Sequence, residues 1–283
     1  MGDLDSLYLK KSSQWAPYYS ALLDICGDTV QLINFGDQKN AGAVNAATFT
    51  GMKKHASGLA PVWTPNEALS AWDTPFDLTL ESNWLGLAPK LTTNGTDEEI
   101  DTPDNDYYFR DDNGSAEKLS VGFWVAPANI SGFDQIFAQY DASSGSELRV
   151  FNIGMDDASV TIRLWDESAN AHINSKTNSL GLVAGQMSFC VMTYNGDTLN
   201  TGLLGYIDGA LSTMSASGSG VYVGMENLAT KPQLFTRLGT SANELFFAGE
   251  VLGGPWGPFM TQTQLTAEQI ADLYQRMRLG LGV

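Results

Sequence analysis

Residues 187–211 read Met-Ser-Phe-Cys-Val-Met-Thr-Tyr-Asn-Gly-Asp-Thr-Leu-Asn-Thr-Gly-Leu-Leu-Gly-Tyr-Ile-Asp-Gly-Ala-Leu, and this stretch decides the fold class. Two short runs of apolar and aromatic residues end at Asn195-Gly196 and at Asp208-Gly209. Both dipeptides tolerate the positive φ angles that tight hairpin turns require. The stretch therefore predicts an antiparallel meander with strands at 187–194, 203–207 and 210–214.

The same pattern continues on both sides of this meander. Residues 119–125 read Leu-Ser-Val-Gly-Phe-Trp-Val, with an apolar residue at every second position. Such alternation is typical of strands that bury one face. Further strands are expected at 133–140, 147–153, 159–166, 234–238 and 246–251, and less regular ones at 30–35, 43–49 and 76–80. About a dozen short strands predict an all-β, antiparallel sandwich.

Only the C-terminal end has a strong helical signature. Thr266 and Gln269 have the spacing of a capping box, and Leu265 and Ile270 that of a hydrophobic staple. We expect Gly280 to end the helix. The stripe that would dock on the sandwich consists of Ile270, Leu273, Tyr274 and Met277.

The composition excludes several classes of protein. Of the 283 residues, 43% are hydrophobic and 17% charged, and the net charge is −17. Such a chain has ample material for a core, and its acidic surface repels nucleic acid and anionic membranes. No apolar run is long enough to span a membrane, so no membrane insertion is expected. The first six residues lack the pattern of a signal peptide, so we expect Cys26 and Cys190 to be reduced and buried.

The N-terminal segment is unusually apolar, and no linker separates a second domain. We therefore expect a docking tail at 1–19 and one jelly-roll domain at 20–283, best supported at 90–275. Exposed apolar surface costs roughly 25 cal/mol per Å². The tail should therefore be buried, either on its own sandwich or on another subunit of an oligomer. The candidate docking residues are Leu7, Tyr8, Trp15, Tyr18 and Tyr19.

Three pieces of the chain together resemble the laminin G-like, concanavalin A-like lectin/glucanase family. These pieces are 119–127, the paired hairpins of 192–211 with their Tyr-Ile-Asp-Gly turn, and 247–251 followed by 263–274. The resemblance implies a jelly roll with a closing strand and helix. The chain departs from the family pattern at 253–258, which reads Gly-Gly-Pro-Trp-Gly-Pro.

A carboxylate pair offers one enzymatic alternative. Residues 99–104, Glu-Ile-Asp-Thr-Pro-Asp, resemble the Glu-x-Asp-x-x-Glu strand motif of related glucanases. Retaining glycosidases need two carboxyl groups about 5–5.5 Å apart. Pro103 breaks the strand alternation and Asp104 is shorter than the expected Glu, so we do not expect an enzyme. A glycoside hydrolase or lyase that uses Glu99 and Asp101 remains the alternative.

Two kinds of binding site remain open. The resemblance implies calcium, for which Asp97, Asp101 and Asp104 are candidate ligands, although their spacing is not diagnostic and no cofactor is required. A sugar site would need aromatic and polar groups, and Trp165, Asp166 and Trp256 are the candidates.

A lectin-like sandwich without a catalytic motif or an export signal predicts a non-enzymatic recognition or structural module. Proteins that act outside the cell without being secreted can be released by lysis. We therefore expect a bacteriophage virion protein, in capsid decoration, a fibre or a tail. Its partners would be other virion proteins and a polysaccharide or host surface. A secreted adhesion module is a further alternative.

Overall fold

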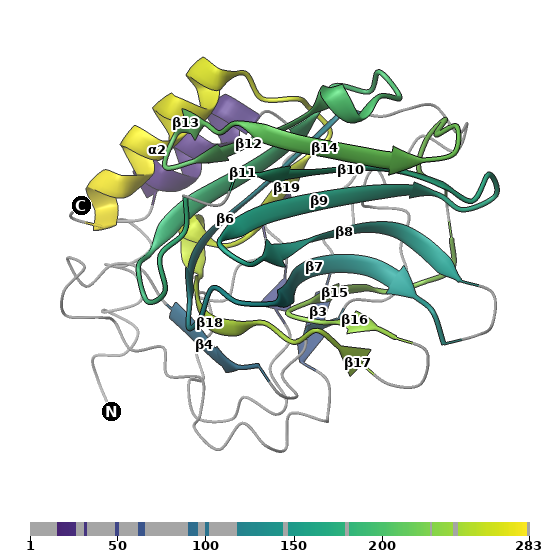
Figure 1. The fold of residues 1–283 in the computed structure, drawn as a ribbon. Helices are drawn as coiled ribbons and strands as arrows, with labels where there is room; N and C mark the ends of the chain where they lie inside the picture. Colours follow the sequence, from purple (N-terminus) through teal and green to yellow (C-terminus); the bar gives the residue numbers. More distant parts are fainter. Residues whose placement is uncertain are drawn as a thin grey trace.

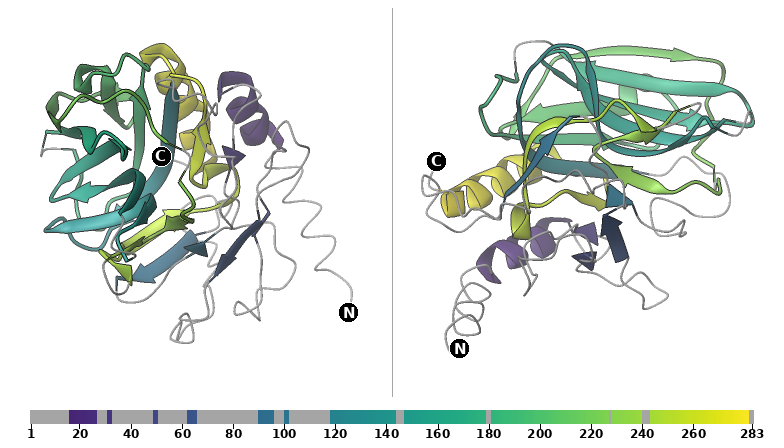
Figure 2. Two further views of the ribbon diagram at one scale, coloured as in Figure 1. Left: turned by 90° about the vertical axis from the view of Figure 1, so that its right-hand side faces the viewer. Right: turned by 90° about the horizontal axis from the view of Figure 1, so that it is seen from below.

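The computed structural model describes residues 16–26, 31–32, 49–50, 62–65, 90–95, 100–101, 118–143, 147–178, 181–226, 228–239 and 243–281. These residues form a sandwich of two sheets, with the helices on the outer side of one of them (Figure 1). The two further views show the order of the layers: the larger sheet, the smaller sheet, and then the helices (Figure 2).

The smaller sheet has eight strands, and its central strand is β6. The path of the sheet is β1-β19-β6-β11-β12-β13, while β18 pairs with both β4 and β6. The bounds are β1 (Gln31–Leu32), β4 (Lys90–Asn94), β6 (Leu119–Pro127), β11 (Ser188–Tyr194), β12 (Leu203–Ile207), β13 (Ala210–Leu211), β18 (Ala248–Leu252) and β19 (Phe259–Thr261).

The larger sheet has eleven strands along the path β14-β10-β9-β8-β7-β15-β5-β3-β2, and β16 joins β7 and β17 at its side. All pairings are antiparallel except the one between β16 and β7. The bounds are β2 (Phe49–Thr50), β3 (Val62–Pro65), β5 (Ile100–Asp101), β7 (Phe133–Asp141), β8 (Leu148–Asp156), β9 (Ser159–Asp166), β10 (Ala171–Thr177), β14 (Met214–Ser219), β15 (Pro232–Leu234), β16 (Arg237–Leu238) and β17 (Asn243–Glu244).

The predicted meander is confirmed. Strands β11, β12 and β13 are hydrogen-bonded neighbours, and β11 also pairs with β6. Asp208 and Gly209 both have positive φ angles, 51° and 80°, in the turn between β12 and β13. A short 3₁₀ turn, η3 (Asn200–Gly202), lengthens the connection after Asn195-Gly196. The all-β sandwich is therefore the fold of this chain.

The main core lies between the two sheets. Every second residue of the central strands enters it, as Val121, Phe123 and Val125 of β6 do. Its largest fully buried side chains include Phe123, Phe137, Phe151 and Tyr194. This layer alone accounts for the alternation that is visible in the sequence.

A second core lies between the eight-stranded sheet and the helices. Helix α2 (Ala267–Leu281) covers the sheet with Ile270, Leu273 and Met277. The capping box is confirmed: the Thr266 N–H donates to Gln269 Oε1 at 2.9 Å, and the Gln269 N–H donates to Thr266 Oγ1 at 3.2 Å.

Gly280 does not end this helix, and that prediction is wrong. Helix α2 continues through Leu281. A Cβ at position 280 would overlap Trp256 Cζ2 and would lie 2.5 Å from Tyr18 Cζ. The glycine therefore serves close packing inside the helix rather than the left-handed turn of a helix end.

An N-terminal helix at residues 16–26 was not predicted. Its buried residues are Ala21, Leu22, Ile25 and Cys26, and Tyr18 and Tyr19 pack beside the second core. Tyr18 lies against Trp256, with ring centroids 4.8 Å apart. The helix crosses the expected boundary between residues 19 and 20, and the division into a tail and a domain stays a prediction.

Both cysteines are free and buried, as expected. Burial raises the pKa of the Cys26 thiol to about 12 and also raises the pKa of Cys190. Within the described residues, no helix has the length and apolar character needed to cross a bilayer.

Candidate functional site

The face of the eleven-stranded sheet that is turned away from the core carries the candidate site, and we call it the outer face. In β9, Val160, Ile162 and Leu164 enter the core. Because side chains alternate along a strand, Thr161, Arg163 and Trp165 lie on the outer face. This face is turned toward the viewer in Figure 1, and the described helices lie on the opposite side of the molecule (Figure 2).

Four residues form a polar row across the outer face. Asn152 in β8 pairs with Arg163 in β9, Arg163 pairs with Asn174 in β10, and Asn174 pairs with Ser217 in β14. Thr161 Oγ1 donates to Asn174 Oδ1 at 3.1 Å, and Asn174 Nδ2 donates to Ser217 Oγ at 3.1 Å. The amide of Asn174 is therefore fixed in its orientation by its neighbours.

Arg163 is the unusual member of this row. Its guanidinium has no hydrogen-bond or ion-pair partner among the described residues, and its Nε is buried. The Oδ1 atom of Asn152, on the paired residue, is also buried without a hydrogen bond. Burial lowers the pKa of Arg163, and the nearby guanidinium of Arg237 lowers it further. Polar atoms that are buried and unpaired are rare in folded proteins and call for an explanation.

The other cations of the outer face have carboxylate partners. Arg149 lies 2.7 Å from Glu167 and 2.7 Å from Glu147, and the hydrogen bond to Glu167 raises its pKa. The remaining pairs are Arg237 with Glu244 at 2.7 Å and Lys176 with Asp156 at 2.9 Å. Among the described cations of this face, Arg163 is thus the one whose charge is not matched by a contact.

An aromatic cluster supports the row from one side. Trp165 packs edge-on against Tyr140 at 5.5 Å between ring centroids. The guanidinium of Arg163 lies 5.3 Å from the Trp165 ring centroid, and that of Arg149 lies 5.8 Å from it. Such cation–π contacts contribute about 0.5–1 kcal/mol when exposed and about 2 kcal/mol when desolvated. They hold Arg163 in place over the indole.

Trp165 was one of the candidates for a sugar contact, and the structure places it in a packing position. Its side chain is 3% exposed, beneath Tyr140 and the two arginines. The ring centroid of His172 lies 6.2 Å from that of Trp165. Burial and the charge of Arg163 lower the pKa of His172. The indole therefore positions Arg163 and offers no free face to a ligand.

Asp166 anchors two loops at the end of the sheet. Its carboxylate is 4% exposed and accepts hydrogen bonds from the Ala169 N–H at 3.1 Å and the Val223 N–H at 3.0 Å. Ser168 Oγ also donates to it, at 3.3 Å. Its oxygens are thus engaged by the chain itself, in a role that supports the rim of the outer face.

Trp256 is far from the outer face and is fully buried in the second core. It lies in the 3₁₀ turn η4 (Gly254–Trp256), and its Nε1 donates to the Met277 carbonyl at 2.8 Å. This contact explains the departure of residues 253–258 from the family pattern, because the loop packs under helix α2. Such an indole cannot stack on a sugar.

Several predicted site residues lie outside the described residues. These are the candidate calcium ligands Asp97 and Asp104, the carboxylate Glu99, and the candidate docking residues Leu7, Tyr8 and Trp15. Asp101 lies in β5 and pairs with Gln233. Within the described part of the chain, no three His, Cys, Asp or Glu residues gather as a metal site would require.

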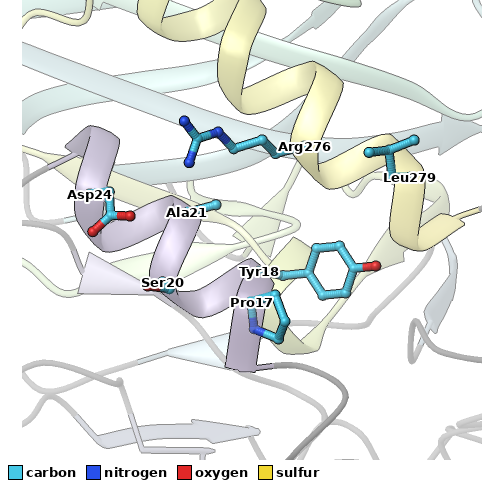
Figure 3. A pocket seen from close by; sticks show the side chains of 7 residues that line it. All are labelled: Pro17, Tyr18, Ser20, Ala21, Asp24, Arg276 and Leu279. Carbon is cyan, nitrogen blue, oxygen red and sulfur yellow. The ribbon is translucent and has the colours of Figure 1, made fainter.

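An open groove of about 540 Å³ separates the N-terminal helix from α2 (Figure 3). Its walls include Tyr18, Ala21 and Asp24 of the N-terminal helix and Arg276 and Leu279 of α2. Arg276 is paired with Asp272 at 2.8 Å, so the groove offers few polar groups that are not already used. It is a weaker candidate for ligand recognition than the outer face.

Sequence reasoning missed Asn152, Arg163 and Asn174. The alternation of β9 could have placed Thr161 and Arg163 on a face opposite to Ile162 and Leu164. The polar row itself depends on the register of four strands, which no local pattern reveals.

The sequence matches the family described as the concanavalin A-like lectin/glucanases superfamily (Laminin_G_3) over residues 94–251. Because the match covers more than half of the chain, this protein belongs to that family. No curated protein matches the chain significantly.

Two botulinum neurotoxin structures have the same fold at low identity, and a carbohydrate-binding module is also similar. The binding domain of botulinum neurotoxin serotype D has a TM-score of 0.55 at 14% identity, covering 92% of this chain and 53% of that one. A structure of botulinum neurotoxin type C, whose cell entry depends on interaction with two ganglioside molecules, has a TM-score of 0.52 at 14% identity. The match covers 87% of this chain and 50% of that one. The CBM40 of a Ruminococcus gnavus sialidase has a TM-score of 0.45 at 8% identity, and the match covers 57% of this chain and 84% of that one. This chain spans about half the length of the two toxin structures.

Proposed function

We propose that this protein is a non-catalytic glycan-binding module and that it binds sugar on the outer face of the eleven-stranded sheet. The observation that carries this proposal is the polar row with the unpaired guanidinium of Arg163 at its centre. Cell entry of botulinum neurotoxin type C, whose structure this chain resembles over half of its length, depends on interaction with two ganglioside molecules, which agrees with this proposal.

The residue types of the row suit sugar hydroxyls. A hydroxyl both donates and accepts, so it fits side chains that present both kinds of group, such as Asn174 and Ser217. Ser217 is exposed and Asn174 partly exposed. The row runs across four neighbouring strands, so it can meet several hydroxyl groups along a chain of sugars.

A glycan array tests the proposal directly. We expect the wild-type protein to bind a subset of glycans, and Ser217→Tyr to weaken that binding because the new ring covers the row. Ser217 is exposed, so the fold should tolerate the ring. The matched control is Ala210→Tyr, an exposed strand position on the other sheet, which should bind as wild type does.

Two results would count against the proposal. Equal binding by Ser217→Tyr and the wild type would move the site elsewhere. Absence of binding to every glycan on an array that covers neutral and acidic sugars would remove the function itself.

The enzymatic alternative has a separate test. Turnover of laminarin, agar or alginate by the wild type that is lost in Glu99→Gln would replace the binding proposal by a hydrolase or lyase. A role in a bacteriophage virion stays a proposal that rests on the sequence reasoning. Cofractionation of the protein with purified virus particles would support that role, and its recovery only as free protein would count against it.

A further inference from the structure

The charge on Arg163 indicates which sugars this face would take. The chain as a whole carries a net charge of −17, yet no described carboxylate contacts this guanidinium. Arg149, Arg237 and Lys176, the other cations of the outer face, each have an acidic partner. An unpaired cation that is partly withdrawn from water gains more from an anionic partner than a fully solvated one does.

The surroundings of Arg163 keep its guanidinium in position. Its Cζ atom lies 5.3 Å from the centroid of the Trp165 ring, and burial lowers the pKa of the group. Burial also means that little water would have to be displaced when a partner arrives. A planar guanidinium that is held in place in this way can match the two oxygens of a carboxylate.

The neighbours of Arg163 fit the rest of a sugar ring. Asn174 and Ser217 continue the row on one side and Asn152 on the other. These groups are neutral, so they add hydrogen bonds without adding charge. One cation flanked by amides and a hydroxyl corresponds to one carboxylate on a ring that otherwise carries hydroxyl groups.

We propose that the outer face binds carboxylate-bearing glycans, in which a uronic or sialic acid places its carboxylate on Arg163. This inference rests on the proposed function and specifies the class of ligand. Sialic and uronic acids share the chemistry that Arg163 recognises, and the experiment separates them.

The first test uses the wild-type protein alone. Sialyllactose and oligogalacturonate are compared with lactose and with methyl-esterified oligogalacturonate, which lack the free carboxylate. We expect an acidic member to bind, and its neutral counterpart to bind roughly 10- to 150-fold more weakly, the range for one hydrogen bond to a charged group. Preference for sialyllactose identifies a sialic acid, and preference for oligogalacturonate identifies a uronic acid.

The second test uses variants. Arg163→Gln should lose affinity for the acidic glycan by a similar factor, and Arg163→Lys should keep part of it, because the charge remains while the planar fork is lost. Lys176→Gln removes the same charge from the same face at a residue that is already paired, and should bind within about twofold of wild type. Thermal unfolding of each variant confirms that the fold is intact.

The outcomes separate the two proposals. Selective binding of neutral glycans, or of sulfated glycans without a carboxylate, would overturn the ligand class and leave the glycan-binding function standing. Equal binding of acid and methyl ester would also overturn the class, and this result does not depend on the folding of any variant. Absence of binding to any glycan would overturn both.

Discussion

Replacing Gly280 by alanine tests how the two helices are held on the eight-stranded sheet. Gly280 is buried in helix α2, and its missing side chain leaves room for Trp256 and Tyr18. Intrinsic preference alone favours the alanine, because glycine costs about 1 kcal/mol relative to alanine in a helix interior. The close packing around Gly280 predicts instead that the alanine lowers the free energy of unfolding.

The magnitude follows from what the new methyl group would meet. It would overlap Trp256 Cζ2 and lie 2.5 Å from Tyr18 Cζ. Tyr18 borders the open groove and can move, whereas Trp256 is fully buried and hydrogen-bonded to Met277. Extra atoms in a packed core typically cost about 1–3 kcal/mol. After the gain in helix preference, we expect a net loss of about 1 kcal/mol in the free energy of unfolding.

Chemical denaturation of Gly280→Ala measures this difference, and limited proteolysis reports whether the N-terminal helix is released. Leu279→Ala is the matched control, because Leu279 is 66% exposed on the same helix and should change stability by less than about 0.5 kcal/mol. A Gly280→Ala protein that is more stable than wild type by about 1 kcal/mol would refute the packing argument.

Four further predictions concern a helix cap, two loops and the thiols. Thr266→Ala should cost about 1 kcal/mol of unfolding free energy, since it removes the acceptor of the Gln269 N–H. Asp166→Ala should cost at least about 2 kcal/mol and speed hydrogen exchange at Ala169 and Val223, whose N–H groups lose their acceptor. Cys26 and Cys190 should resist thiol reagents at pH 8 until the protein is unfolded by guanidinium, and rapid labelling of the native protein would contradict their burial. The pKa of Cys26 is raised to about 12 in the folded protein, so its contribution to stability is complete below about pH 8.5 and falls as the pH rises. The free energy of unfolding of Cys26→Ala should therefore fall less steeply between about pH 8.5 and 12 than that of the wild type.

The sheets could be predicted where one face of a strand is apolar and the turns are specific. The meander of β11, β12 and β13 meets both conditions, and so does the capping box of α2. Strands β10 and β14 were missed because they are rich in polar residues: β14 reads Met-Ser-Ala-Ser-Gly-Ser and is almost entirely exposed. Their pairing depends on the register with β9 rather than on a pattern of their own.

Errors at single residues came from packing between distant segments. Gly280 has the sequence features of a helix end, but contact with Trp256, 24 positions earlier, keeps it inside the helix. The N-terminal helix had a visible apolar spacing at Tyr18, Leu22 and Ile25, which the irregular flanking sequence obscured. Trp165 was named as a candidate for sugar contact, and in the structure Arg149 and Arg163 cover it.

The candidate site could be predicted only in part. Trp165 and its strand were identified, but the partnerless state of Arg163 results from side chains on β8, β9 and β10 that meet through the sheet register. The alternation along a strand shows which face a residue lies on, but it does not show which carboxylate pairs with a given arginine. Only the assembled face shows that Glu167 pairs with Arg149 and not with Arg163.

A crystal structure with a glycan selected by the array would show whether sugar binds on the outer face at Arg163. We expect a pyranose ring over the polar row, with a carboxylate in contact with the guanidinium of Arg163 and hydroxyls on Asn174 or Ser217. A glycan bound in the groove between the N-terminal helix and α2, or anywhere that leaves Arg163 unoccupied, would show that the outer face is not the binding site.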